Sequence, residues 1–212
     1  MKDTYSQALQ DKDVIEYYRE KIGGFFVDAG AFNGVRFSNT YLLEKKYGWK
    51  GVCIEPQHDV FKKLTEQRTA ICENVVLYSE PKTVSFKRRK ERGNGFAGIQ
   101  QHLKRRTPQP KLNETLNLQT KTLTSILDEH NCPKFIDYLS LDTEGSEIEV
   151  LKGLDLHRYQ VGYMTIEVNS SVDKPWEVLS HLEPYEFYLK KVSRGPKGKV
   201  LDAHFVRHTP TL

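Results

Sequence analysis

Phe-Phe-Val-Asp-Ala-Gly-Ala-Phe-Asn-Gly, residues 25–34, is the stretch that decides the fold. Apolar residues lead up to Asp28, and glycines follow at Gly30 and Gly34. An apolar run that ends on an acid and then on glycine is typical of a buried strand followed by a tight turn, because glycine accepts the positive φ that such a turn needs. We therefore expect the first strand of a sheet here, with its carboxyl end at Asp28.

Predicted helices and strands alternate along the rest of the chain. Helices are expected at residues 11–21, 41–47, 58–68, 123–130, 146–152 and from Lys174, and strands at residues 50–55, 70–72, 135–142 and 163–168. Two β runs flank a turn at residues 79–82, and alternation resumes at residues 116–120. Strand–helix–strand units with short connections predict a parallel sheet. Residues 185–192 and 199–206 predict a C-terminal antiparallel hairpin. The expected fold class is α/β, doubly wound and mainly parallel.

The composition is that of a globular protein. The chain has 212 residues, 38% hydrophobic and 28% charged, which fits a single domain over residues 1–212. We expect an N-terminal helix about residues 1–22 and a basic insertion about residues 82–111.

The first residues lack a secretion signal, and no run approaches the roughly 18 to 20 apolar residues of a membrane span, so we expect a cytoplasmic protein. Three cysteines without CxxC spacing argue against a disulfide framework or cysteine-rich zinc site, and Cys53 is expected to be buried.

Two acids follow successive predicted strands, Asp28 and Glu55. The turn after Asp28 lacks the GxGxxG pattern that a dinucleotide pyrophosphate requires. A zwitterionic cofactor without phosphates, such as S-adenosylmethionine, suits this turn better, with Asp28 accepting from its ammonium group and Glu55 from its ribose hydroxyls. The alternative is that either acid only caps the helix that follows it.

Three segments resemble the FkbM family of methyltransferases. They are FFVDAGAFNGVRFSNTYLLEKKYGWKGVCIEPQHDVFKKL (residues 25–64), IDYLSLDTEGSEIEVLKGL (136–154) and YMTIE (163–167). The resemblance implies a seven-stranded class I, Rossmann-like methyltransferase fold that uses S-adenosylmethionine and generally acts on oxygen. It places the cofactor at Asp28, Gly30, Gly34 and Glu55 and assigns functional roles to Asp142 and Glu144. With neighbouring positions added, the candidate cofactor residues are Asp28, Gly30, Ala31, Asn33, Gly34, Glu55, Pro56 and Asp142.

The candidate catalytic residues are Asp142, Glu144 and Glu167. Asp142 ends an apolar strand and Glu167 ends the next one, so both should lie at the carboxyl edge of the sheet, where open α/β folds place their chemistry. Asp142 or Glu144 is the candidate general base for a hydroxyl acceptor. Asp142, Glu167 and Asn169 are also a candidate Mg²⁺ site of hard oxygen ligands. Alternatively, Glu144 and Glu147 only favour a helix N-terminus.

His204 lies in a terminal β run. We expect a half-exposed sheet residue there, with a general base as the less favoured reading.

Positive charge is concentrated in residues 82–111, with ten basic residues and one acid, a net +9, whereas the rest of the chain carries −5. Such a segment favours an acidic or phosphorylated substrate, and its glycines, Gly93, Gly95 and Gly98, suggest a mobile loop or lid. The alternative is a solvated basic loop without a ligand role. Candidate substrate-binding residues are Arg36, Asn39, Arg88, Arg89, Arg105 and Arg106.

Three functions remain open at this point. The leading one is O-methylation of a sugar, glycan or related small molecule that can be anionic. The second is 2′-O-methylation of an RNA cap ribose that uses the basic segment, although few aromatic residues interleave its cations. The third is a non-catalytic binding module with the same fold. The sequence does not predict the oligomeric state.

Overall fold

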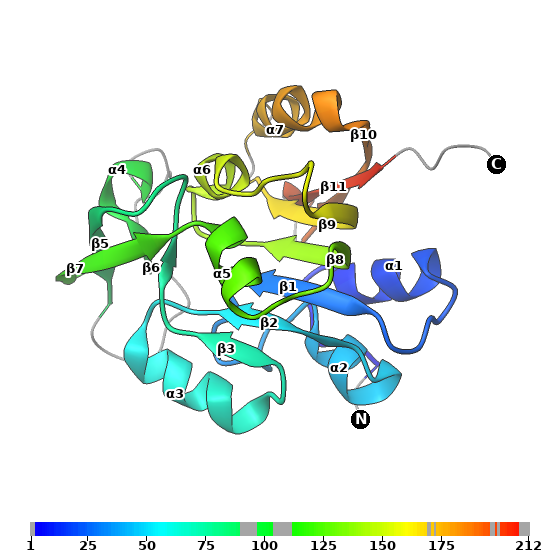
Figure 1. Cartoon of the computed structure of the whole chain (residues 1–212), viewed down its shortest axis with the longest axis horizontal. Coiled ribbons are helices and arrows are strands. Elements are labelled where there is room, and N and C mark those ends of the chain that lie inside the picture. Colours follow the sequence, from blue (N-terminus) through cyan, green and yellow to red (C-terminus); the bar gives the residue numbers. More distant parts are fainter. Residues whose placement is uncertain are drawn as a thin grey trace.

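The computed structural model describes residues 3–89, 97–103, 112–168, 171, 173–195, 198 and 200–207. Its main sheet has seven strands in the order β10-β11-β9-β8-β1-β2-β3 (Figure 1). These strands are β1 Phe25–Ala29, β2 Lys50–Ile54, β3 Ile71–Glu73, β8 Phe135–Leu141, β9 Gln160–Glu167, β10 Phe187–Arg194 and β11 Val200–Arg207. Neighbours pair in parallel from β3 across to β9, and β9, β11 and β10 pair antiparallel. The predicted fold class and the C-terminal hairpin are confirmed.

The strand order reverses between β1 and β8. The chain builds outward from β1 through β2 to β3 and then returns to add β8 on the other side of β1, with Asp28 opposite Ser140. In open α/β sheets, ligands bind outside the carboxyl ends of the strands at such a switch point. The topology therefore places the ends of β1 and β8 at the centre of the expected site.

Helices cover both faces of the sheet, as a doubly wound fold requires. They are α1 Gln10–Tyr17, α2 Tyr41–Tyr47, α3 His58–Gln67, α5 Leu123–Glu129, α6 Glu147–Lys152 and α7 Lys174–Leu182, followed by the short 3₁₀ helix η1 Glu183–Tyr185. Apolar side chains of α5, α6 and α7 pack on one face, which carries Val27 and Val52. Those of α1, α2 and α3 pack on the other, which carries Phe26 and Cys53. The strands are buried on both faces, which explains their continuous apolar sequences.

A second sheet lies off the carboxyl ends of the main strands (Figure 1). Its order is β4-β7-β5-β6, with β4 Val76–Leu77, β5 Thr83–Arg88, β6 Ala97–Ile99 and β7 Glu114–Lys121, and the one-turn helix α4 Gln100–Leu103 follows β6. The two β runs predicted about residues 79–82 are present, but β7 lies between them. Gly98, taken as a sign of a mobile loop, lies within β6. Gly93 and Gly95 lie outside the described residues.

Helix α1 is shorter than the predicted residues 11–21. It ends at Tyr17 because Arg19 and Glu20 adopt positive φ angles of 50° and 58°, which a helix cannot continue through.

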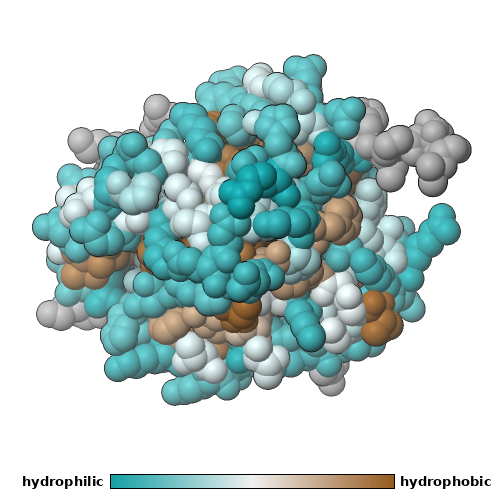
Figure 2. Space-filling model, viewed as in Figure 1, coloured by the Kyte–Doolittle hydropathy of each residue, from teal (hydrophilic) through white to brown (hydrophobic). Residues whose placement is uncertain are grey.

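Among the residues with described coordinates, no helix combines the length and the apolar character needed to cross a membrane. The face seen in Figure 2 is largely hydrophilic, with its hydrophobic residues in small separate patches. The single-domain boundaries stay a prediction.

The turns after β1 and β8 touch through their backbones. The Asp142 amide donates to the Ala29 carbonyl at 2.9 Å, and a Cβ added at Gly30 would lie 1.9 Å from the Asp142 carbonyl oxygen. Gly30 also has a φ of +92°. Glycine is required here for both its conformation and the close approach that it permits.

Replacing Gly30 by alanine tests this contact, with Gly48→Ala as the matched control. Both glycines have positive φ, but a Cβ at Gly48 has no neighbour within 4 Å among the described atoms. The control should cost only the conformational penalty of about 1–2 kcal/mol. Gly30→Ala must also displace the Asp142 carbonyl and should cost at least about 3 kcal/mol of unfolding free energy, measured by urea denaturation. Equal losses in the two variants would contradict the backbone contact.

Candidate active site

A cavity of about 280 Å³ opens at the carboxyl ends of β1, β2 and β8. This is near the lower end of the range of small-molecule sites, about 300 to 1,000 Å³. Among its described lining residues, four are acidic: Asp28, Glu55, Asp142 and Glu144. The second sheet supplies apolar lining from Leu77, Phe86, Ala97 and Ile99. The cavity therefore combines a carboxylate-rich floor with an apolar wall.

Asp28 is 4% exposed and is held by a buried cation. Its Oδ2 accepts from Thr40 Oγ1 at 2.5 Å and lies 3.8 Å from the guanidinium of Arg68. Arg68 also donates to Glu44 Oε2 at 2.7 Å and to Thr40 Oγ1 at 2.9 Å. Burial raises the pKa of Asp28, and Arg68 opposes that rise. Arg68 thus ties the end of β1 to α2 and α3.

Arg68 also lowers the pKa of its second partner, Glu44, and there the net shift is downward. Burial alone would raise the pKa of Glu44, but Arg68, together with hydrogen bonds from Lys45 and Thr69, outweighs it and holds the pKa at about 2. Glu44 is therefore ionised at every physiological pH and keeps Arg68 in place.

Glu55 is the second buried acid, 4% exposed. Its two carboxylate oxygens accept backbone hydrogen bonds from Phe32 at 3.1 Å and from Gln57 at 2.8 Å. Burial nevertheless raises its pKa from 4.5 to about 7. The Gln57 bond lies at the start of α3, so part of the capping alternative holds, and the same carboxylate lines the cavity.

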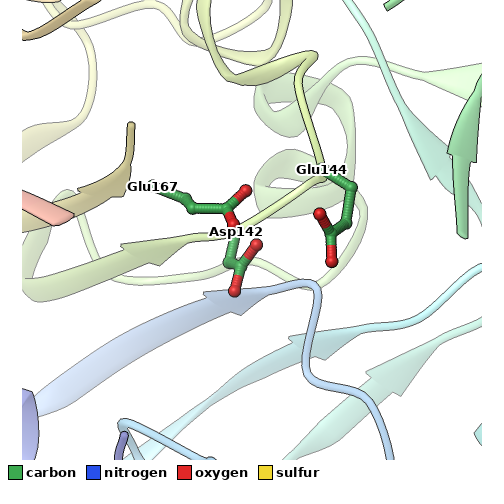
Figure 3. Close-up of side chains that lie close together, drawn as sticks. All are labelled: Asp142, Glu144 and Glu167. Carbon is green, nitrogen blue, oxygen red and sulfur yellow. The ribbon is translucent and has the colours of Figure 1, made fainter. Parts of the chain in front are cut away.

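Asp142, Glu144 and Glu167 bring their carboxyl groups together, with one oxygen of each within 4.8 Å of the others (Figure 3). Burial, and next the charge of Glu144, raise the pKa of Asp142 well above its usual range, while a hydrogen bond with Glu167 opposes the rise. Two carboxyl groups can form a hydrogen bond only when a proton lies between them. Among the described groups, Asp142 Oδ1 is buried without a hydrogen-bond partner. The cluster therefore needs a proton or another positive charge.

Glu147 organises the turn after β8. It is fully buried and accepts from the backbone amides of Thr143 at 3.0 Å and Gly145 at 2.9 Å. Lys174 pairs with its other oxygen at 2.6 Å. Glu147 is the first residue of α6, where the helix N-terminus alternative placed it, and its carboxylate holds the turn that precedes the helix. Glu144, by contrast, lines the cavity and has a φ of +61°. Such a conformation is uncommon for glutamate and places strain at the site.

Apart from Arg88 and Arg89, the predicted site residues divide into three groups. Those that line the cavity are Asp28, Gly30, Ala31, Arg36, Asn39, Glu55, Pro56, Asp142 and Glu144. Three others are not among the described lining residues: Glu167 forms a hydrogen bond with Asp142, Asn33 accepts from the amides of Val35 and Arg36, and Gly34 packs against Arg68 and Leu64. Asn169, Arg105 and Arg106 lie outside the described residues. The structure therefore brings together the acids of β1, β2, β8 and β9.

Arg88 is occupied elsewhere. It pairs with Asp59 and, at 2.5 Å, with Glu114. Neither Arg88 nor Arg89 is among the described lining residues. The candidate substrate role of these two arginines stays a prediction.

His204 is not half-exposed, as the alternating sequence suggested. It is 0% exposed, and it bonds Tyr163 Oη through Nδ1 at 2.8 Å and Ser193 through Nε2. Burial lowers its pKa to about 3, so it is neutral. The reason is that β11 lies between β9 and β10 and is covered by α1. As expected, Cys53 is buried.

Arg68 and Gln7 were missed in the sequence. Arg68 closes a polar helix end, where an arginine is usually solvated, and its acidic partners are 24 and 40 residues away. Gln7 lines the cavity from the segment before α1. The isolated acid Glu44 within an apolar helix face was the signal that could have indicated a buried cation.

Comparison with known proteins agrees with this fold. The Methyltransferase FkbM domain matches residues 28–200. No curated protein matches the chain. Methyltransferase FkbM from Methylobacillus flagellatus KT superposes with a TM-score of 0.56 at 14% identity, over 87% of this chain and 43% of that chain. This chain therefore spans less than half the length of that protein.

Two further solved structures share the fold. Precorrin-6y C5,15-methyltransferase from Geobacter metallireducens GS-15 has a TM-score of 0.51 at 10% identity, over 93% of this chain and 87% of that one. The N-terminal domain of human METTL16 in complex with SAH has a TM-score of 0.51 at 11% identity, over 94% and 68%. At these identities the likeness concerns the fold.

Arg68→Met should destabilise the protein strongly. It removes the cation shared by Asp28 and Glu44, and removing one member of a buried ion pair costs about 3–5 kcal/mol. The control is Arg158→Met, which removes a surface ion pair with Asp128 whose arginine is 49% exposed and should leave the denaturation midpoint almost unchanged. Urea denaturation of both variants measures the difference. Similar losses would show that Arg68 is not the central ion partner.

Glu55 should make stability depend on pH. Because its pKa is raised to about 7 in the folded protein, its contribution is fully present below the unfolded pKa and is lost as the pH rises through 7. Between pH 5 and pH 9, the unfolding free energy of the unmodified protein should fall by about 2–3 kcal/mol more than that of Glu55→Gln. Parallel urea denaturation profiles for the two proteins would refute the raised pKa.

Proposed function

The chain belongs to the FkbM methyltransferase family, and from this premise we propose that it transfers the methyl group of S-adenosylmethionine to a hydroxyl oxygen of a sugar, glycan or related small molecule. The observation that carries the proposal is the convergence of Asp28, Glu55 and Asp142 on one cavity at the switch point of the sheet. Asp28 and Glu55 serve the cofactor, and Asp142 serves the acceptor.

The residues on the cofactor side fit S-adenosylmethionine. The Phe32 and Gln57 amides fix the Glu55 carboxylate, whose remaining lone pairs suit two ribose hydroxyls. Asn39 Nδ2 donates to Ser140, while its Oδ1, among the described groups, is buried without a partner and is available to a ligand donor. Asp28 offers a negative charge for an ammonium group. When bound, the cofactor supplies an electrophilic methyl group on a positively charged sulfur.

Asp142 and Glu167 handle the acceptor proton. Their hydrogen bond requires one proton between them, so the pair retains one negative charge and accepts the proton that the hydroxyl gives up. Glu144, close to both, raises the proton affinity of Asp142. Transfer also requires the hydroxyl oxygen to be held in line with the methyl group, which the walls of the cavity provide.

The same three carboxylates suit a divalent cation. Asp142, Glu144 and Glu167 offer hard oxygen ligands of the kind that Mg²⁺ prefers. A cation there would replace the shared proton and lower the pKa of a bound hydroxyl. This set replaces Asn169 of the predicted metal site by Glu144.

The proposal predicts that substitutions on the cofactor side weaken cofactor binding, whereas a substitution on the acceptor side lowers the rate of methyl transfer. Asp28→Asn and Glu55→Gln should each weaken S-adenosylhomocysteine binding about tenfold, measured by calorimetry, because each removes a charged hydrogen-bond acceptor. Asp142→Asn should leave that affinity within about threefold and lower methyl transfer at least about 100-fold, the usual effect of losing a general base. Glu177→Gln, an exposed acid on α7, is the matched control and should change neither.

Transfer is followed with labelled S-adenosylmethionine and a panel of sugars, sugar phosphates and RNA oligonucleotides, with EDTA and Mg²⁺ arms. The proposal fails if the unmodified protein does not bind S-adenosylhomocysteine. Binding without transfer to any acceptor would favour the non-catalytic module. Transfer to RNA, with binding that weakens steeply with salt, would favour the RNA function. Loss of transfer in EDTA, restored by Mg²⁺, would assign the cation role.

A further inference from the structure

The segment before α1 is anchored at both of its ends. We call residues 4–10 the strap. Asp11, which is fully buried, accepts from Thr4 Oγ1 and Ser6 Oγ, both at 2.7 Å, and from the Tyr5 amide at 2.8 Å. Five of the seven strap residues take part in such hydrogen bonds, because the Ala8 amide also donates to Gln10 Oε1 at 2.7 Å. These bonds give the strap a defined path.

The strap crosses the carboxyl edge of the sheet. At one end the Tyr5 ring lies 4.6 Å from the ring of Tyr41 on α2. At the other end the buried Gln10 amide donates to Asp202 on β11, and Asp202 is paired in register with Glu167. Gln7 lies between these anchors, is exposed, and lines the cavity that contains Asp142. The strap therefore places a neutral hydrogen-bonding side chain at the cavity mouth.

Arg36 and Phe37 line the same mouth. Both are exposed, and the Arg36 guanidinium lies 4.5 Å from the centre of the Phe37 ring. Phe37 holds a φ of +61°, an uncommon and strained conformation for an aromatic residue, which its surroundings must hold in place. Stacking preorganises the guanidinium and leaves its N–H edges available for a bidentate partner.

The charges of the cavity-lining residues indicate what kind of group would bind near Arg36. Arg36 is the one cation among the cavity-lining residues that the structure describes, and none of the described carboxylates forms an ion pair with it. Four carboxyl groups line the cavity, and each of them that is ionised repels an anion. An acceptor with an anionic group at one end and a hydroxyl at the other would therefore bind with the anion at Arg36 and the hydroxyl directed toward Asp142.

We propose that Gln7 and Arg36 form a subsite for an oxyanion group, phosphate or carboxylate, on the methyl acceptor. Arg36 supplies charge and a bidentate fork, and Gln7 supplies a further hydrogen-bond donor from the strap. The inference rests on the proposed function, since it concerns the acceptor of that reaction. It makes Gln7 and Arg36 determinants of acceptor specificity.

Calorimetry on the protein saturated with S-adenosylhomocysteine tests this subsite. The probes are glucose 6-phosphate, glucuronate and uncharged glucose. We expect the two anionic sugars to bind at least about tenfold more tightly than glucose, as one charge-assisted contact implies. Arg36→Gln should abolish this preference, and Gln7→Ala should lower the affinity for both anionic probes about threefold to tenfold. Arg158→Gln, which removes a surface cation elsewhere, should change nothing.

The affinity for S-adenosylhomocysteine distinguishes failure of the subsite inference from failure of the proposed function. It should stay within about twofold in the Gln7 and Arg36 variants, since neither residue serves the cofactor. 5′-Methylthioadenosine lacks the amino-acid carboxylate of S-adenosylhomocysteine. If Arg36→Gln weakens the binding of S-adenosylhomocysteine but not that of 5′-methylthioadenosine, Arg36 serves the cofactor and the inference is overturned. Equal binding of charged and uncharged sugars would also overturn it. In both cases the proposed function stands, whereas failure of the unmodified protein to bind S-adenosylhomocysteine removes the function itself.

Discussion

The backbone contact between Gly30 and Asp142 is the constraint on which the site depends. It joins two turns more than 100 residues apart in sequence, and the Asp142 amide bonds the Ala29 carbonyl across it. Any side chain at Gly30 would separate the turns. Because they touch, the acids at the carboxyl ends of β1 and β8 line one cavity, and a reaction between two ligands held by different strands becomes possible.

Gathering carboxylates in one cavity has an electrostatic cost, and the protein offsets it differently for each acid. Asp28 has the buried cation Arg68, Glu55 has two backbone amides, and Asp142 shares a proton with Glu167. Burial still raises the pKa of all three acids. The cavity therefore favours positive charge, which suits a sulfonium cofactor and explains why the acceptor anion is assigned to the rim.

The local sequence pattern was sufficient to predict the fold and the positions of the principal acids. Apolar runs that end on acid or glycine located β1, β2 and β8, and the parallel order then required Asp28, Glu55 and Asp142 to share an edge. Nonlocal pairing was not visible: β7 inserts between β4 and β5, and α1 covers His204. Gln7 escaped notice because its position depends on side-chain bonds to Asp11 rather than on a helix or strand.

A crystal structure of the protein with S-adenosylhomocysteine tests the central claim most directly, because that claim concerns where one ligand lies. We predict the ribose hydroxyls within hydrogen-bond distance of Glu55, the amino-acid portion beside Asp28, and the sulfur facing Asp142. A ligand bound outside this cavity, or inside it with neither Asp28 nor Glu55 in contact, would contradict the account.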